Sequence, residues 1–303
     1  MKGLTLFAPS AATVALFCLS AATAVPQAIA QDSPPAWAYP VNPPDFKPAP
    51  DDSTLRRVPD STLTLTLPQV RDRFFTPDWH SSDHPPMPEV VARGRKPDVS
   101  ACGFCHRTNG AGGPENANIA GLPVDYIIQQ LADFKSGARK SAVQKRAPTE
   151  LKARLAQHST DAEIAAAAAY FATIPAQSWV SIVETDIVPK SFVKGWHLAA
   201  VTTAEKEPIG QRIIEVPEDL EQFVSRDSRS RFFAYVPTGS IQKGQQLATT
   251  GGNGKTVQCS LCHGPELKGV GPIPGIAGRS PPTPFASSTI SNAAHARVLQ
   301  AST

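Results

Sequence analysis

The sequence has little of what marks several common protein classes. Its 303 residues carry a formal net charge of only +3 at pH 7, so it lacks the basic surplus of nucleic-acid-binding domains. Beyond the first thirty residues, no stretch approaches the length and hydrophobicity of a membrane span. We therefore expect no nucleic-acid partner and no transmembrane segment in the mature chain.

Methionine and cysteine are also scarce. The two methionines are Met1 and Met87, and Met87 lies in a Pro-rich stretch. Of the five cysteines, Cys18 falls in the N-terminal apolar segment and the other four form two pairs of identical spacing. If each pair acts as a unit, no thiol is left for a structural disulfide.

The first thirty residues are typical of a secretory signal peptide. They hold one charge, Lys2, an apolar run over residues 13–22, and the small-residue site Ala28-Ile29-Ala30. A retained membrane anchor is the alternative, but the run is too short to span a bilayer comfortably. We expect cleavage after Ala30 and a periplasmic mature protein, in an oxidising compartment.

Each cysteine pair is followed at once by a histidine. Residues 102–106 read Cys-Gly-Phe-Cys-His, and residues 259–263 read Cys-Ser-Leu-Cys-His. In a CxxCH motif the two thiols attach to the vinyl groups of a haem, and the histidine ligates the iron. Two motifs predict two covalent haem c groups. The predicted attachment residues are Cys102, Cys105, Cys259 and Cys262, and the predicted proximal ligands are His106 and His263.

A zinc site made from the four thiols is the main alternative, because paired CxxC units also have zinc-ligand spacing. The long separation of the pairs, the histidine after both and the predicted export favour haem. A redox-active dithiol is less favoured, since such sites do not need the following histidine.

Helical and strand patterns alternate along the chain. Apolar residues recur at helical spacing from Tyr126 to Phe134, and Gly137 fits a C-cap. Thr160 and Glu163 form a capping box that starts a further, alanine-rich helix. Short β-branched runs at residues 180–183, 213–216 and 232–236 predict strands.

We therefore predict a mainly α fold with two haem lobes joined by a small strand-containing insert, behind a Pro-rich N-terminal extension. The predicted parts are a signal peptide (1–30), the extension (31–87), a first lobe (88–174), an insert (175–238) and a second lobe (239–303).

The lobes resemble diheme class I cytochromes c of the cytochrome c4 kind. In the first lobe the resemblance is carried by residues 102–106, 119–121, 126–139 and 169–172, and in the second by Gly244, residues 259–264, Gly269 and residues 272–279. It implies two helical lobes and electron transfer. It also implies that each proximal histidine donates its other ring nitrogen to a backbone carbonyl in a Gly-Pro segment. Pro272 or Pro274 suits that role in the second lobe, whereas residues 115–117 of the first lobe lack a proline.

The resemblance also implies a methionine as the second axial ligand, which this chain does not offer in the usual place. The family position falls near Lys152, whose amine must lose its proton to ligate iron. Lys152 is our distal candidate, with His158 and Met87 as weaker ones. A solvated lysine and an open or water-bound iron are the alternatives.

The second lobe looks incomplete, because fewer residues follow His263 than the first lobe uses from His106 to Ile174. We expect its haem to be exposed. His197 or His295 could supply a ligand there, but we interpret both, like His80 and His84, as surface or loop residues.

The favoured function is an electron carrier, not an enzyme. Its expected partners are a membrane or periplasmic dehydrogenase, a cytochrome complex or a terminal oxidase. A diheme peroxidase and a cytochrome subunit of a periplasmic dehydrogenase are the alternatives, and fold analogy does not separate them.

Overall fold

The structure is a computed structural model that describes residues 37–140, 143, 147–201 and 204–281. The predicted signal peptide lies outside these residues. None of the helices within them combines the length and hydrophobicity needed to cross a membrane.

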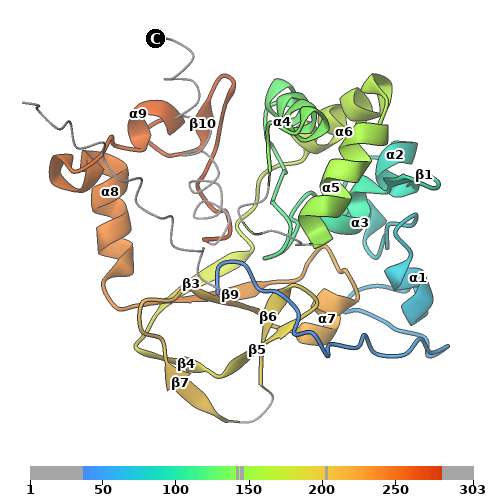
Figure 1. The fold of residues 1–303 in the computed structure, drawn as a ribbon, viewed down its shortest axis with the longest axis horizontal. Coiled ribbons are helices and arrows are strands. Elements are labelled where there is room, and N and C mark those ends of the chain that lie inside the picture. Colours follow the sequence, from blue (N-terminus) through green and yellow to red (C-terminus); the bar gives the residue numbers. More distant parts are fainter. Residues whose placement is uncertain (1–36, 141–142, 144–146, 202–203, 282–303) are drawn as a thin grey trace, which may run out of the picture. The chain divides into compact units, whose positions relative to one another are not determined.

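A helical region surrounds the first CxxCH motif (Figure 1). Helices α4 and α5 pack on each other, and α4 also packs on α6. Their shared core contains Leu131, Ala168 and Phe171, all buried. The elements of this region are α2 (Glu89–Ala92), β1 (Gly94–Arg95), β2 (Val99–Ser100), α3 (Cys102–His106), α4 (Val124–Ser136), α5 (Ala147–His158) and α6 (Asp161–Thr173).

Local sequence signals set the ends of these helices, as predicted. Helix α4 stops at Gly137, which adopts the left-handed conformation at φ 76°. Helix α6 begins with the expected capping box, in which the Glu163 amide donates to Thr160 Oγ1 over 3.2 Å and the Thr160 amide donates to the Glu163 carboxylate over 2.8 Å. Helix α6 is rich in alanine and packs against α4 and α2.

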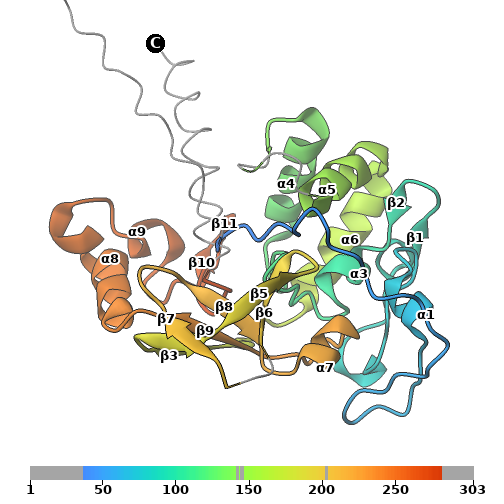
Figure 2. The same cartoon turned by 60° about the horizontal axis from the view of Figure 1, so that its bottom comes forward.

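A strand region follows the helices. Its main sheet has the order β3-β9-β8, with β3 and β9 parallel and β8 and β9 antiparallel. Two antiparallel pairs, β4 with β7 and β5 with β6, lie beside it (Figure 2). The bounds are β3 (Val180–Glu184), β4 (Ile187–Pro189), β5 (Ser191–Lys194), β6 (His197–Ala200), β7 (Lys206–Pro208), β8 (Ile214–Pro217), α7 (Leu220–Val224) and β9 (Phe232–Val236).

These strands confirm the predicted β-branched runs, but a mainly α class is not confirmed for the chain as a whole. The described residues contain strands as well as helices. The two-lobe organisation is not confirmed either. Around the second motif the described residues contain α8 (Ser240–Gly254), α9 (Ser260–His263), β10 (Gly269–Val270) and β11 (Ile273–Pro274). Within residues 239–281 there is no counterpart of α4, α5 and α6, and residues 282–303, with His295, lie outside the described part.

The N-terminal extension contributes α1 (Leu67–Arg71), the 3₁₀ turn η1 (Ser81–Asp83) and a small apolar cluster that includes Val70 and Trp79. The Trp79 indole nitrogen donates to the Ser225 carbonyl over 2.8 Å. The extension is therefore tied to the turn after α7 in the strand region.

Candidate cofactor site

The first CxxCH motif forms the short helix α3, held against the extension and α2. There is no room for a side chain at Gly103, because a Cβ would lie 2.7 Å from the Thr76 side chain and 3.0 Å from the Val91 carbonyl oxygen. Thr76 Oγ1 itself donates to that carbonyl over 2.7 Å. Close packing thus orients the side chains of Cys102 and Cys105 toward one cavity.

Both motif histidines are oriented by a backbone carbonyl eleven residues further on. His106 Nδ1 donates to the Ala117 oxygen over 2.9 Å, and His263 Nδ1 donates to the Pro274 oxygen over 2.7 Å. The implied bond is therefore present in both motifs, and it does not need a proline in the first. Burial lowers the pKa of His106 to about 3, so its imidazole is neutral and Nε2 is left with a lone pair.

The motifs differ in the residue after the histidine and in exposure. Arg107 has φ 66° and ψ 169°, a region that suits glycine, and Gly264 has φ 79° and ψ 163° at the matching position. His106 is buried, whereas Cys262 and Leu261 of the second motif are exposed, Leu261 by 69%. The expected exposure of the second site agrees with this geometry.

One cavity of about 780 Å³ lies between the motifs and is lined by both His106 and His263. Its walls are mainly apolar, with Phe104, Leu131 and Phe134 among them. The volume is within the range of small-molecule and cofactor sites. The first motif therefore lines this space with both cysteines and its histidine, whereas the second motif contributes His263 alone.

The donor set of this cavity fits a large apolar group that carries negative charges at its edge. Besides the Cys102 and Cys105 thiols and the histidines, the lining contains four arginines, Lys152 and a single carboxylate, Glu115. Burial raises the pKa of the Cys102 thiol to about 11 and raises that of Cys105. Covalently held haem, which has an apolar ring and propionate groups, matches this combination.

Comparison with protein families supports the same conclusion. Residues 91–175 match the family model of cytochrome c. This segment contains a cytochrome c domain. The match spans α3 to α6 and thus the first motif with its helical core.

Comparisons with curated proteins and with solved structures give no further information about the function. The curated proteins contain no match to this chain. Among solved structures, thiosulfate dehydrogenase (TsdBA) from Marichromatium purpuratum, in its as-isolated form, is 22% identical, with a TM-score of 0.34 over 60% of this chain and 27% of that chain. The chain thus corresponds to about a quarter of that protein's length, and a TM-score this low does not indicate a shared fold or function.

Of the three distal candidates, only Lys152 lines the cavity. Burial lowers the pKa of Lys152, against the opposing influence of the two thiols. The His158 side chain is 45% exposed and its Nε2 lies 3.9 Å from Asp98. Met87 packs against the core of the cytochrome c domain. Lys152 is thus partly buried at the cavity wall, and its role as a distal ligand stays a prediction.

Three histidines interpreted as surface or loop residues have side chains shielded from solvent, although His80 and His84 do lie in irregular segments. His80 is 4% exposed, with Nε2 3.1 Å from the Asp227 carboxylate. His84 Nε2 lies 3.0 Å from Asp78, which raises the pKa of His84. His197 is 3% exposed and packs edge-on to Phe223. The surface interpretation of His80 and His197 was wrong because their partners, Asp227 and Phe223, are brought to them by tertiary packing.

Two arginines near the first motif were missed by sequence reasoning. Arg107 is buried and lies over the Phe223 ring, 5.0 Å from its centroid. Arg226 lies over Phe104, at 3.6 Å, and donates to its carbonyl. Both contacts join the cytochrome c domain to the strand region, and no local pattern in the sequence predicts them.

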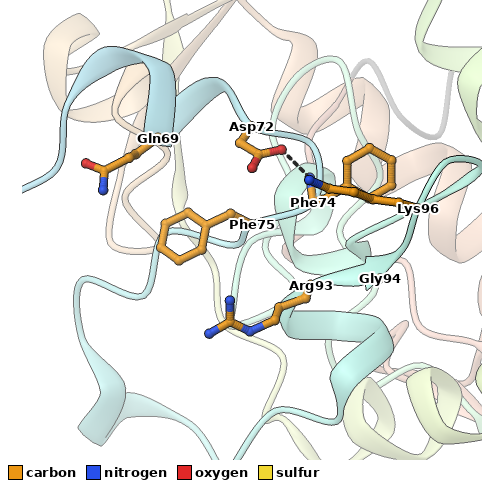
Figure 3. Close-up of a pocket in the computed structure, with 7 residues that line it drawn as sticks. All are labelled: Gln69, Asp72, Phe74, Phe75, Arg93, Gly94 and Lys96. Carbon is orange, nitrogen blue, oxygen red and sulfur yellow. Dashed lines mark hydrogen bonds between the residues drawn. The ribbon is translucent and has the colours of Figure 1, made fainter. Parts of the chain in front are cut away.

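The four motif thiols do not gather into a metal cluster in the part of the chain that the structure covers, where no group of three or more His, Cys, Asp or Glu side chains is placed to hold a metal ion. A second pocket, of about 360 Å³, is lined by Gln69, Asp72, Phe74, Phe75, Arg93, Gly94 and Lys96 (Figure 3). It contains neither cysteine nor histidine, so it offers nothing for haem attachment.

Proposed function

We propose that this chain is an exported diheme electron carrier, related to the cytochrome c4 kind, that passes single electrons between redox proteins. The carrying observation is that two CxxCH helices present histidines to one cavity, each with Nδ1 engaged by a carbonyl eleven residues on. The cytochrome c domain supports haem-based electron transfer.

The side chains have separable tasks in this proposal. The haem iron supplies a one-electron couple when bound. Cys102 and Cys105 would hold the first haem, and Cys259 and Cys262 would hold the second. The Ala117 and Pro274 carbonyls hold the protons of the histidine Nδ1 atoms, so that each Nε2 is available as proximal ligand. The apolar walls exclude water from the first site.

We infer that Lys152 supplies the distal nitrogen at the first site. In support, Lys152 of α5 lines the cavity, and burial lowers its pKa and so favours the neutral form that ligation needs. We expect Lys152→Ala to convert the first haem to high spin. Lys152→Met is expected to raise its reduction potential, because a thioether ligand favours the reduced iron.

Absorption spectra and redox titrations of the two variants check this role. Lys140→Ala is the matched control, since Lys140 is exposed and outside the cavity lining. A low-spin spectrum of Lys152→Ala that is the same as that of the control would show that another group binds the iron.

The two-haem proposal is tested by the mass of the intact purified chain and by its haem content. We expect two covalent groups in the wild type and one in Cys102→Ala/Cys105→Ala and in Cys259→Ala/Cys262→Ala. One group or none in the wild type would overturn the proposal. Fractionation of expressing cells tests the periplasmic location.

An enzyme of the diheme peroxidase kind is the second candidate, and the exposure of Cys262 and Leu261 at the second motif favours it. Peroxide turnover by the holoprotein would support the enzyme. A low-spin spectrum that does not respond to peroxide or cyanide supports the carrier. Co-purification with a dehydrogenase would favour the role of a dehydrogenase subunit. For the electron carrier, the proposed partners are a membrane or periplasmic dehydrogenase, a cytochrome complex or a terminal oxidase.

A further inference from the structure

The turn between β5 and β6 contains a residue that tight hairpins normally avoid. The two strands pair antiparallel with Lys194 opposite His197, so Gly195 and Trp196 alone make the turn (Figure 2). Their φ angles are 61° and 75°, both positive, as in a type I′ turn. Such turns prefer asparagine, aspartate and glycine, because a positive φ strains a bulky side chain. Glycine meets this demand at the first position of the turn, and tryptophan does not at the second.

Contacts from two other segments hold the turn in this conformation. The Trp196 amide donates to Asn42 Oδ1 of the extension over 3.3 Å. The His197 side chain, which follows directly, is buried with its ring centroid 4.6 Å from that of Phe223. Ala199 of the same strand is fully buried. A strained backbone persists only where its surroundings determine it, and such residues concentrate at functional and ligand sites.

The strained residue is also part of the cavity wall at the first motif. Trp196 is partly buried and lines the cavity of about 780 Å³ that Cys102, Cys105 and His106 line as well. The turn lies outside residues 91–175, which match cytochrome c. The insert therefore adds an aromatic side chain to a cavity whose cysteines and first histidine belong to the cytochrome c domain.

We propose that Trp196 packs against the haem held by Cys102 and Cys105 and forms part of the wall that keeps water from it. This inference rests on the proposed function, because it needs haem at the first motif. An indole ring offers a large apolar surface. Glycine would suit the backbone of the turn better but would leave this part of the wall open.

The wall has a consequence for the reduction potential. Ferric haem carries one more positive charge than ferrous haem, and an apolar, water-free environment disfavours the more charged form. Trp196 thereby raises the potential of the first haem. It acts as a positioning residue of the insert and takes no part in the attachment or ligation of haem.

The first test is nuclear magnetic resonance of the indole N–H groups in the full holoprotein, with the second motif removed as Cys259→Ala/Cys262→Ala. Each indole signal is assigned by its loss in the matching Trp→Phe variant. Line broadening by ferric iron falls steeply with distance, so we expect oxidation to broaden the Trp196 signal most. The comparison signals come from the three tryptophans outside the cavity lining, Trp37, Trp79 and Trp179.

Mass measurement precedes the spectra and separates the two proposals. A wild-type chain without haem at Cys102 and Cys105 overturns both. Haem in place, with a Trp196 signal no broader than those of the other three tryptophans, overturns the Trp196 contact alone. Should the chain without the second motif not accumulate, the same comparison in the wild-type holoprotein keeps this criterion.

The second test is the midpoint potential of the first haem in Trp196→Gly. Glycine adopts a positive φ without strain, so the turn is retained while the ring is lost. We expect a lower potential, with a tenfold shift of the ferric-to-ferrous ratio, about 59 mV for one electron. Trp196→Phe keeps an aromatic ring and should stay closer to the wild type.

Phe192→Ala is the matched control, because Phe192 belongs to the same hairpin, is 45% exposed and does not line the cavity. Equal potentials in Trp196→Gly and Phe192→Ala would overturn the proposal. A potential as low in Trp196→Phe as in Trp196→Gly would overturn it too, because the effect would then not depend on an aromatic wall.

Discussion

At the scale of single residues, Glu215 shows how burial changes a charge. It is 2% exposed, accepts a hydrogen bond from Ser280 Oγ over 2.5 Å, and burial raises its pKa from 4.5 to about 8. The folded state thus holds a proton that the unfolded chain releases above pH 4.5. Its contribution to stability is favourable below that pH and is lost as the pH rises toward 8.

We therefore expect Glu215→Gln to have the wild-type melting temperature near pH 4. From about pH 6 to 9 its melting temperature should be higher, because its unfolding free energy exceeds that of the wild type by an amount on the order of a few kcal/mol. Thermal melts across this pH range measure the difference. Glu218→Gln is the control, because Glu218 is exposed. A constant offset between Glu215→Gln and wild type at all pH values would contradict the raised pKa.

Gly103 is a second residue-scale case. Gly103→Ala would bring its Cβ to 2.7 Å from Thr76, and overpacking of this kind costs about 1–3 kcal/mol. We expect a lower denaturation midpoint and less haem incorporated at the first motif. Ser260→Ala, at the same place in the second motif, is the control. Equal haem content and midpoint in both variants would show that α3 tolerates the added methyl group.

At the scale of elements, the start of α6 depends on Thr160 and Glu163. Arg95 donates to the Glu163 carboxylate over 2.9 Å and lowers the pKa of Glu163 to about 2. Thr160→Ala removes the side-chain cap and should cost about 1 kcal/mol of unfolding free energy. Thr160→Ser retains the hydroxyl and should lose little. Denaturant titration compares them, and coincident curves for the two variants would mean that the cap adds nothing measurable.

At the scale of the whole molecule, the extension is joined to the strand region through Trp79. Trp79→Phe removes the donor to the Ser225 carbonyl, and we expect a loss of about 1 kcal/mol in unfolding free energy with faster amide exchange over residues 220–230. Phe192→Leu, at a residue 45% exposed on β5, is the control for aromatic substitution. Unchanged exchange in Trp79→Phe would show that the turn after α7 is held by other contacts.

Local patterns determined much of this protein. The CxxCH motifs, the Gly137 stop, the Thr160–Glu163 start and three of the strands follow from residues a few positions apart, because helix caps, short strands and haem attachment need only neighbouring groups. The two attachment sites and the two histidine ligands stay predictions. The cavity lined by Cys102, Cys105 and both histidines, with each histidine held by a carbonyl, agrees with them, whereas Cys259 and Cys262 do not line it.

Only the tertiary structure decided which distant groups surround the motifs. It shielded the side chains of His80, His84 and His197 from solvent, put Lys152 but not His158 or Met87 on the cavity wall, and placed Arg226 against Phe104 across 122 positions of sequence. These outcomes depend on how separate segments pack, and packing joins residues whose sequence separation carries no local signal. The sequence alone determined where haem is expected, and the fold determined what surrounds it.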